Sequence, residues 1–363
     1  MILRGGTCVV CCELMPTKNG KLGSFAAPLV AVAVLLALAL PASAGAAAQP
    51  RVVGGSATDV SHYPWQAALV YSGSRYSGND AQRQLCGAVL VAPRIALTAA
   101  HCIVNTDRDL LGGDLDPNDA DLVLNETTLS NGDGEHHTLQ AIQVQPDYNP
   151  TANTNDVAYL VLATPSSQQP IKLVGPTETA LMAPSYPTEV SGYGVLDPSS
   201  STGSNTLRAA TVPIIGDSTC SGEYGSDFVA GAMVCAGYVS GGIDSCFGDS
   251  GGPLQAPAQG GVYRLAGLVS FGEGPTGCAD SGFPGVYSRV GASPPSWLFQ
   301  AVVNEVATVE SQQGLAHTDI VGSGALPLGT PAAEKKCKKH RKLNKKTGKC
   351  VKKKKHNKKR KRS

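Results

Sequence analysis

The sequence predicts an all-β protein, organised as one unit over residues 52–290. Short apolar runs recur there between clusters of glycine, proline, serine and asparagine, which is typical of short strands joined by turns. Glycine is also abundant, with 42 of the 363 residues. Long polar segments at 71–84, 107–121 and 196–205 are predicted to be surface insertions.

The chain begins with a predicted secretory signal peptide over residues 1–44. Residues 25–40 are almost wholly apolar, two lysines precede them, and an Ala-Ser-Ala cleavage signal follows at 42–44. The apolar run is too short and wrongly flanked for a stable membrane span, so we expect none in the mature chain. Because the leader is overlong when counted from Met1, we hypothesise that translation starts at Met15.

A histidine follows two predicted strands. The runs 89–91 and 95–97 are apolar and β-branched, as in buried strands, and Thr-Ala-Ala-His-Cys follows at 98–102. A histidine just past a strand end can lie at the rim of a core with one ring nitrogen exposed. A lone histidine is more often structural, so His101 becomes a candidate general base only if the sequence also supplies a nucleophile and an orienting acid.

An aspartate and a serine later in the sequence are candidates for these two roles. Asp156 precedes a strand-like run at 157–162, although by itself it would be an ordinary turn residue. Residues 246–253 read Cys-Phe-Gly-Asp-Ser-Gly-Gly-Pro. Glycines on both sides of Ser250 would let a substrate carbonyl approach the backbone closely. A serine needs a base and donors for the developing oxyanion before it can act as a nucleophile.

These three motifs resemble those of the trypsin-like (chymotrypsin-family) serine proteases, and they occur in the order His, Asp, Ser that this family uses. The resemblance covers residues 52–290 and implies two antiparallel β-barrels, with the active site between them and a C-terminal helix. It implies that Ser250 is the nucleophile, His101 the general base and Asp156 its orienting acid. The N–H groups of Gly248 and Ser250 would form the oxyanion hole.

The resemblance also implies a pocket for a long cationic side chain. Asp244 matches the acid at the base of that pocket, and a buried carboxylate favours a cationic partner. Gly272 and Gly285 match wall positions that must lack side chains, so we expect cleavage after Arg or Lys. The expected substrate-binding residues are Asp244, Ser245, Ser270, Phe271, Gly272 and Gly285.

Residues 51–55, Arg-Val-Val-Gly-Gly, resemble the activation junction of the family. Cleavage after Arg51 would remove a short propeptide, residues 45–51, and release the amine of Val52. That amine is expected to pair with the carboxylate of Asp249. Since the cut follows an arginine, we hypothesise that the enzyme activates itself.

Six cysteines fall within the predicted protease domain, an even set that implies disulfides in a secreted protein. Their spacings fit no zinc pattern, and by spacing alone they allow fifteen pairings. The resemblance implies three of these, namely Cys86–Cys102, Cys220–Cys235 and Cys246–Cys278.

The family needs no cofactor, but one loop carries clustered acids. Glu126, Asp133 and Glu135 lie in a segment that resembles the calcium loop of trypsin, where hard oxygen ligands would bind Ca²⁺. An ordinary solvated acidic loop is the competing interpretation.

The C-terminal part divides by composition. We expect the protease domain to span 52–306 and to end in a helix over 296–306, followed by a flexible linker rich in Gly, Ala, Ser and Pro at 307–334. The tail, 335–363, holds 18 lysines and arginines and no acid, so we expect it to be disordered. Residues 52–334 hold 8 basic against 27 acidic side chains.

The basic tail allows three interpretations. It docks on an anionic polymer, lies against the acidic enzyme, or is inert and removed by cleavage. We favour retention at the cell surface by a polyanion. The expected protein is thus a secreted or envelope-associated monomer acting on peptides with Arg or Lys. The rival class of function is a protease-like binding protein that has lost its chemistry.

Overall fold

The computed structural model describes residues 52–104, 113–294, 296–328, 341–343 and 350–352. The predicted leader, the propeptide, Arg51 and most of the basic tail lie outside the described residues, so the expectations for them stay predictions. Within the described residues, no helix is both long and apolar enough to cross a membrane.

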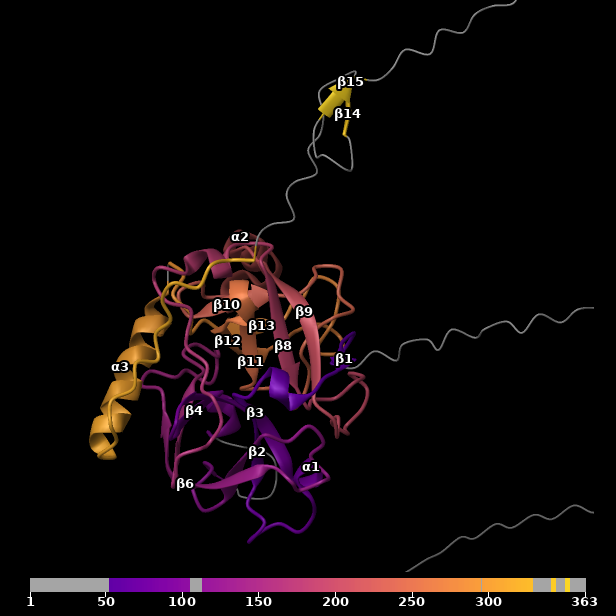
Figure 1. Ribbon diagram of the computed structural model, residues 1–363. Coiled ribbons are helices and arrows are strands. Elements are labelled where there is room, and N and C mark those ends of the chain that lie inside the picture. The colour runs from indigo at the N-terminus through magenta and orange to yellow at the C-terminus, as the bar shows by residue number, and fades with distance from the viewer. Residues whose placement is uncertain (1–51, 105–112, 295, 329–340, 344–349, 353–363) are drawn as a thin grey trace, which may run out of the picture. The chain divides into compact units, whose positions relative to one another are not determined.

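The first half of the domain is a closed six-stranded antiparallel barrel, drawn in indigo and purple in Figure 1. Its apolar runs are almost entirely buried, because their side chains fill the barrel or pack against neighbouring elements. The predicted strands at 89–91, 95–97 and 157–162 all belong to it. In barrel order the strands are β2 (Gln66–Tyr71), β3 (Gln84–Ala92), β4 (Ile95–Thr98), β7 (Ala158–Leu162), β6 (Glu135–Val144) and β5 (Ala120–Leu124).

The second half is also a six-stranded barrel, which closes by pairing of its first two strands, and the short β1 adds to its edge. The all-β, two-barrel prediction is therefore confirmed. The strands are β8 (Pro187–Gly192), β9 (Arg208–Ile215), β10 (Met233–Ala236), β13 (Val286–Ser288), β12 (Tyr263–Phe271) and β11 (Pro253–Pro257), with β1 at Ser56–Ala57.

The barrels meet through buried polar bonds as well as apolar packing. Trp65 Nε1 donates to Gln255 Oε1 over 2.6 Å, and Ser191 Oγ donates to Gln66 Oε1 over 2.7 Å. All four of these residues are buried. Since each bond joins residues from different barrels, the two halves are held in a fixed relation, which a site shared between them requires.

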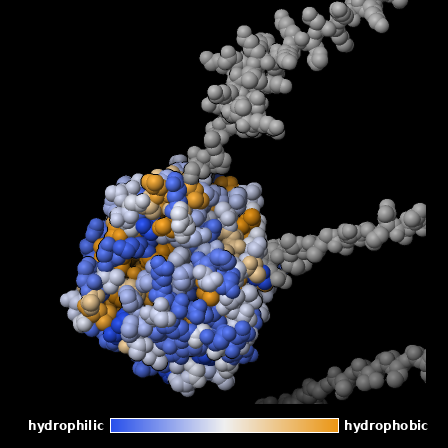
Figure 2. All heavy atoms as spheres, viewed as in Figure 1, coloured by the Kyte–Doolittle hydropathy of each residue, from blue (hydrophilic) through white to orange (hydrophobic). Residues whose placement is uncertain are grey.

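Helices are few and mostly at the surface. They are α1 (Asp80–Arg83), α2 (Asp217–Tyr224) and α3 (Trp297–Gln312), with 3₁₀ turns η1 (Val60–His62), η2 (Ala100–Cys102), η3 (Thr179–Met182), η4 (Gly225–Asp227) and η5 (Gln259–Gly261). The face seen in Figure 2 is mainly polar, with small, separated apolar patches. A two-stranded antiparallel pair, β14 (Arg341–Leu343) with β15 (Cys350–Lys352), forms in the basic tail, so the prediction of disorder is wrong for these two segments.

The C-terminal helix is longer than predicted, and the linker prediction is wrong for residues 307–328. The helix begins at its N-cap Ser296 and buries Val306 and Val309. After it, Leu173 N–H donates to Ile320 O over 2.8 Å, and Gly322 N–H donates back to Leu173 O over 2.9 Å. The small residues that suggested a linker instead let this segment lie against the second barrel, where a Cβ on Gly322 would fall 2.2 Å from Arg264 Nε.

All three predicted disulfides are present: Cys86–Cys102, Cys220–Cys235 and Cys246–Cys278. The first includes Cys102, next to His101, and the third includes Cys246, the first residue of the octapeptide that contains Ser250. Two of the disulfides thus restrain loops that carry the candidate site.

Candidate active site

His101 and Asp156 are brought together from two elements of the first barrel. His101 lies on η2, directly after β4, and Asp156 lies just before β7, which pairs with β4. The Nδ1 atom of His101 is 2.8 Å from Asp156 Oδ2, and its backbone N–H donates to Asp156 Oδ1 over 2.9 Å. Both carboxylate oxygens therefore fix the position of the histidine.

Asp156 is fully buried, and the second barrel supports it. Ser270 Oγ donates to Asp156 Oδ2 over 2.5 Å, and Ser288 Oγ donates to the backbone oxygen of Asp156 over 2.7 Å. Burial alone would raise the pKa of this carboxyl group. Attraction to His101 and the hydrogen bonds from His101 and Ser270 outweigh that effect and lower the pKa below its usual value. The group is thus suited to stay ionised and to stabilise an imidazolium ion.

Ser250 lies in a tight loop between the barrels that fits only glycine at one neighbouring position. Gly251 has φ +77°, and a Cβ there would fall 2.6 Å from the backbone oxygen of Gly87. The carbonyl of Ser250 accepts the N–H of Gly87 over 2.8 Å, and the carbonyl of Gly248 accepts from Gln84 Nε2, also over 2.8 Å. These bonds fix the Gly248–Asp249 and Ser250–Gly251 peptide planes.

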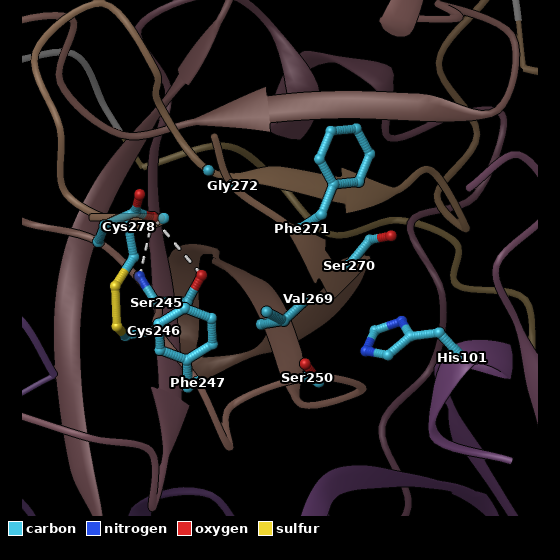
Figure 3. A pocket seen from close by; sticks show the side chains of 13 residues that line it. His101, Ser245, Cys246, Phe247, Ser250, Val269, Ser270, Phe271, Gly272 and Cys278 are labelled. Atoms are coloured by element: carbon cyan, nitrogen blue, oxygen red, sulfur yellow. Dashed lines mark hydrogen bonds between the residues drawn. A yellow bond between two sulfur atoms is a disulfide. The ribbon is translucent and has the colours of Figure 1, made fainter. Parts of the chain in front are cut away.

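A cavity of about 270 Å³ opens next to these groups. Figure 3 shows His101 and Ser250 at one end of it and the Cys246–Cys278 disulfide at the other. The cavity lining includes all six predicted substrate-binding residues, together with His101, Cys246, Phe247, Ser250, Val269, Gly277 and Cys278. A serine hydroxyl, an imidazole and a shaped cavity are what nucleophilic acyl transfer requires.

Asp244 belongs to this cavity and is 1% exposed. Its Oδ1 accepts the N–H of Ser245 over 2.8 Å, and its Oδ2 accepts that of Ala279 over 3.2 Å. Burial outweighs these bonds and raises the pKa of Asp244 to about 7. A Cβ on Gly285 would fall 2.4 Å from Asp244 Oδ1, so access to the carboxylate depends on glycine at that position.

The walls of the cavity contain a second small residue and an aromatic rim. A Cβ on Gly272 would fall 2.7 Å from the backbone oxygen of Gly277, so this position is also restricted to glycine. Phe271 lines the cavity as predicted, and Phe247, which is 53% exposed, lies near Gly277. The result is a narrow channel with an apolar rim and an acidic residue in its lining.

Asp249, next to the serine, is completely buried. Its carboxylate accepts the N–H groups of Gly194 over 2.8 Å and Cys246 over 3.0 Å. Burial nevertheless raises its pKa to about 6. Val52 is 1% exposed and lies in the apolar core of the second barrel. Asp249 is thus a buried acid that accepts hydrogen bonds from neutral N–H groups, and the Val52 side chain is buried in the core of the same barrel.

Sequence reasoning missed the glycines that surround this acid. A Cβ on Gly192 would fall 2.1 Å from Asp249 Oδ1, and one on Gly194 would fall 2.5 Å from its Cγ. The Gly-Tyr-Gly pattern at the end of β8 was the available signal. Gln84, which orients Gly248, was also missed, because nothing in the local sequence marks it.

Two of the predicted calcium ligands, Glu126 and Asp133, lie close together, but among the described residues the three acids form no common ligand cluster. The carboxylate of Glu135 accepts hydrogen bonds from the Ser167 N–H and Oγ, both over distances below 3 Å, and from Gln168 Nε2 at 3.0 Å. Glu126 instead points inward, where its Oε1 accepts the N–H of Gly132 over 2.7 Å. The three acids were grouped by sequence proximity, but the Glu135 carboxylate is bonded to residues 167 and 168 instead. This trio therefore does not fit a calcium site.

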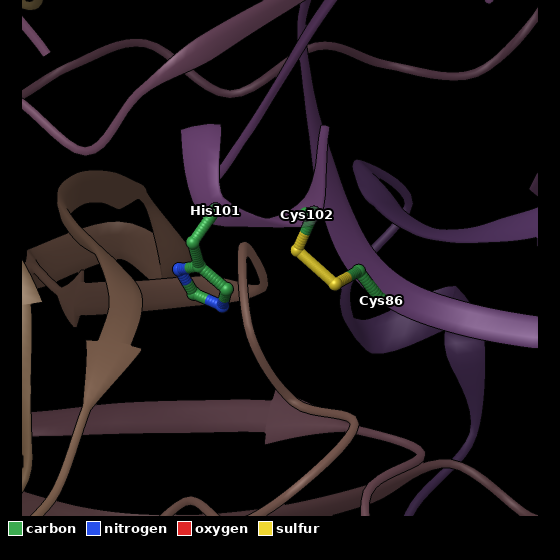
Figure 4. A group of neighbouring side chains, drawn as sticks. All are labelled: Cys86, His101 and Cys102. Atoms are coloured by element: carbon green, nitrogen blue, oxygen red, sulfur yellow. A yellow bond between two sulfur atoms is a disulfide. The ribbon is translucent and has the colours of Figure 1, made fainter. Parts of the chain in front are cut away.

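Another grouping of potential ligands lies beside the candidate site. Figure 4 shows His101 next to Cys86 and Cys102, with ligand atoms within 4.8 Å of one another. The two sulfurs are joined as a disulfide, and a metal needs thiolates. This grouping is therefore structural and holds the histidine loop.

Comparisons with known proteins agree with this geometry. A model of the Trypsin family matches residues 52–295. A protein named trypsin from Saccharopolyspora erythraea is 36% identical over 241 residues, which cover 66% of this chain and 94% of that protein. A trypsin-like protease from Streptomyces glaucescens is 32% identical, over 73% of this chain and 88% of that protein. Trypsin-1 from Astacus astacus is also 32% identical, over 66% of this chain and 95% of that protein.

Proposed function

Because the chain belongs to the trypsin family and is a serine endopeptidase, we propose that it hydrolyses peptide bonds after arginine or lysine. The proposal includes catalysis by Ser250, His101 and Asp156, secretion, and activation by cleavage after Arg51. The observation that carries the specificity is the buried Asp244 in the lining of the cavity.

In the proposed mechanism Ser250 Oγ attacks the scissile carbonyl carbon while His101 accepts its proton. The C–N bond then breaks as His101 returns the proton to the leaving amine, and a water molecule hydrolyses the acyl-enzyme by the same steps in reverse. Asp156, bonded to Nδ1, holds the ring in the required tautomer. The N–H groups of Gly248 and Ser250 stabilise the oxyanion, and each such donor is typically worth about 10²–10³ in rate.

Specificity follows from the cost of an unpaired buried carboxylate. Among the described residues, the donors to Asp244 are neutral, namely two backbone N–H groups and the Ser245 hydroxyl, and burial raises its pKa to about 7. A guanidinium or ammonium group entering between Gly272 and Gly285 would pair with it in a water-poor cavity. Losing such a partner typically costs about 3–5 kcal/mol, which is large enough to dominate the choice of side chain.

The cost of an unpaired buried carboxylate also supports the proposed activation by cleavage. Asp249 is buried and its pKa is raised to about 6, so an ammonium group beside it would be strongly favoured. Cleavage after Arg51 would create one on Val52, whose side chain is already in the core. The Asp249 pairing would then stabilise the loop that carries Gly248 and Ser250. Self-activation follows from the same specificity.

The test uses short chromogenic peptides that end in Arg, Lys, Phe or Ala. We expect hydrolysis after Arg and Lys, and a loss of at least about 10²-fold in kcat/KM for both in Asp244→Ser. Asp227→Ser, which removes an exposed acid, is the control and should change nothing. A preference for Phe or Ala in the wild-type enzyme contradicts the specificity.

Two further variants separate catalysis from activation. Ser250→Ala should abolish hydrolysis while leaving the fold intact. Arg51→Gln should leave purified precursor uncleaved and inactive, and unchanged maturation would disprove self-activation. If the protein with a released Val52 amine hydrolyses none of the peptides, the rival interpretation as a binding protein would replace the enzymatic one.

A further inference from the structure

A second cluster of ligand-type side chains lies in the first barrel, away from Ser250. Asp80 comes from α1, Glu126 from the loop after β5, and His136 from β6. One oxygen from each acid and one ring nitrogen of the histidine lie within 4.8 Å of one another. Three separate segments therefore meet at one point.

Glu126 carries the clearest sign of a missing ligand. It is 1% exposed, and although Oε1 is bonded to the Gly132 N–H, Oε2 is buried with no hydrogen-bond partner. A buried carboxylate oxygen with no partner is costly, so a cation at this point would relieve a real deficit.

Asp80 offers a second oxygen to the same point. It is 2% exposed, and its Oδ1 pairs with Arg83. Its Oδ2 lies 3.1 Å from His136 Nε2, at ion-pair distance but without the geometry of a hydrogen bond. The side chain of His136 is 39% exposed, which gives an ion a route from solvent to the two buried oxygens.

We propose that Asp80, Glu126 and His136 bind one divalent transition-metal ion of the Zn²⁺ class. Two carboxylates and an imidazole suit zinc, with water as a fourth ligand, whereas calcium takes six to eight oxygens. Ligand atoms at about 2.0–2.2 Å from a tetrahedral ion lie about 3.4 Å apart. The existing cluster thus needs only a small closure, and the exposed His136 side chain can supply it.

Metal binding at this point would also act on a groove beside the catalytic loop. A groove of about 730 Å³ is lined by Ala81 and Gln82 of α1 and extends to Gly248. Gln84, directly after α1, bonds the carbonyl of Gly248. An ion that ties Asp80 to the first barrel would therefore restrain this wall of the groove. The proposed effect of the metal on the groove rests on the proposed function, whereas the metal binding itself does not.

The binding test is a zinc titration of the full-length Ser250→Ala protein, read by calorimetry and by metal content after dialysis. We expect this protein to bind one equivalent more zinc than the same protein with His136→Ala. Glu126→Gln should lower the affinity for that additional zinc ion at least about tenfold. Histidines in the basic tail are present in every variant, so they cancel in the difference.

His317→Ala is the matched control. His317 is also exposed and contacts one buried carboxylate, Glu310 Oε2 at 2.9 Å, but no second acid completes a cluster there among the described residues. It should bind as much zinc as the parent protein. Equal zinc content in the parent and in His136→Ala overturns the proposal. So does an ion that proves to be calcium, bound equally well without His136.

The coupling test uses the active enzyme with two substrates. Zinc should change KM for a long peptide that extends on both sides of the scissile bond, and should leave a short chromogenic substrate unaffected. His136→Ala should remove the difference. If zinc binds with the expected stoichiometry and KM does not change for either substrate, the site stands and the coupling is wrong.

Discussion

At the scale of single residues, three buried acids have their pKa values shifted in different directions by different surroundings. Asp156 is paired with His101, which holds its pKa below the usual range, whereas burial raises the pKa values of Asp244 and Asp249 to about 7 and about 6. The first already has its cation. Asp244 lies where a substrate is expected to bring a cation, and Asp249 lies where a new N-terminus is expected to do so.

Asp244 gives a pH-dependent prediction. In the empty cavity its carboxyl group is mostly protonated below pH 7, and only the ionised form attracts a cation. The affinity for a small amidinium ligand should therefore rise about tenfold from pH 6 to pH 8 and then level off. Calorimetry on His101→Ala isolates Asp244 from the other titrating group in the cavity. Affinity that does not vary with pH contradicts the prediction, and Asp244→Asn should bind weakly at every pH.

At the scale of elements, loops between strands carry the chemistry and the barrels fix their spacing. Residues 98–102 and 246–253 could be identified from sequence because each motif is local. The segment after the C-terminal helix could not, since Gly, Ala, Ser and Pro favour a linker locally. Its order comes from distant partners, such as Leu173 and Arg264 of other segments, which no window of sequence contains.

Ile320 tests that packed segment. It is 3% exposed, whereas a residue of a flexible linker would contribute nothing to stability. Ile320→Ala should lower the free energy of unfolding by about 2–5 kcal/mol, measured by urea denaturation of the Ser250→Ala protein. Leu326→Ala, in the same segment but 59% exposed, is the control and should have little effect. If both substitutions had equally small effects, the prediction of a flexible linker would be correct after all.

At the scale of the whole molecule, charge is divided between an acidic domain and a basic tail. Residues 52–334 hold 8 basic and 27 acidic side chains, and 335–363 holds 18 basic side chains and no acid. Such a division allows the tail to dock on an external polyanion, as we propose, or on the acidic surface of the enzyme itself. The tail is also rich in the bonds that the enzyme is proposed to cleave, so a bound polyanion would protect it.

Salt dependence distinguishes docking from an inert tail. Affinity for an anionic polysaccharide should fall by about 10³-fold or more between 50 and 200 mM salt, because each neutralised charge releases a counterion. A protein that ends at residue 334 should not bind. Binding of equal strength with and without the tail, or a flat salt response, would rule out docking.

The sequence by itself determined the catalytic candidates, because their motifs are short and local, and through its resemblance to a known family it implied the two-barrel fold and the disulfide partners. Only the tertiary structure decided which acids share a site. It separated Glu135 from Glu126 and placed Asp80 and His136 beside Glu126 instead. It also enclosed Asp249 with Gly192 at the end of β8 and Gly194 just after it. Burial and contact depend on residues far apart in sequence, and the folded chain alone brings them together.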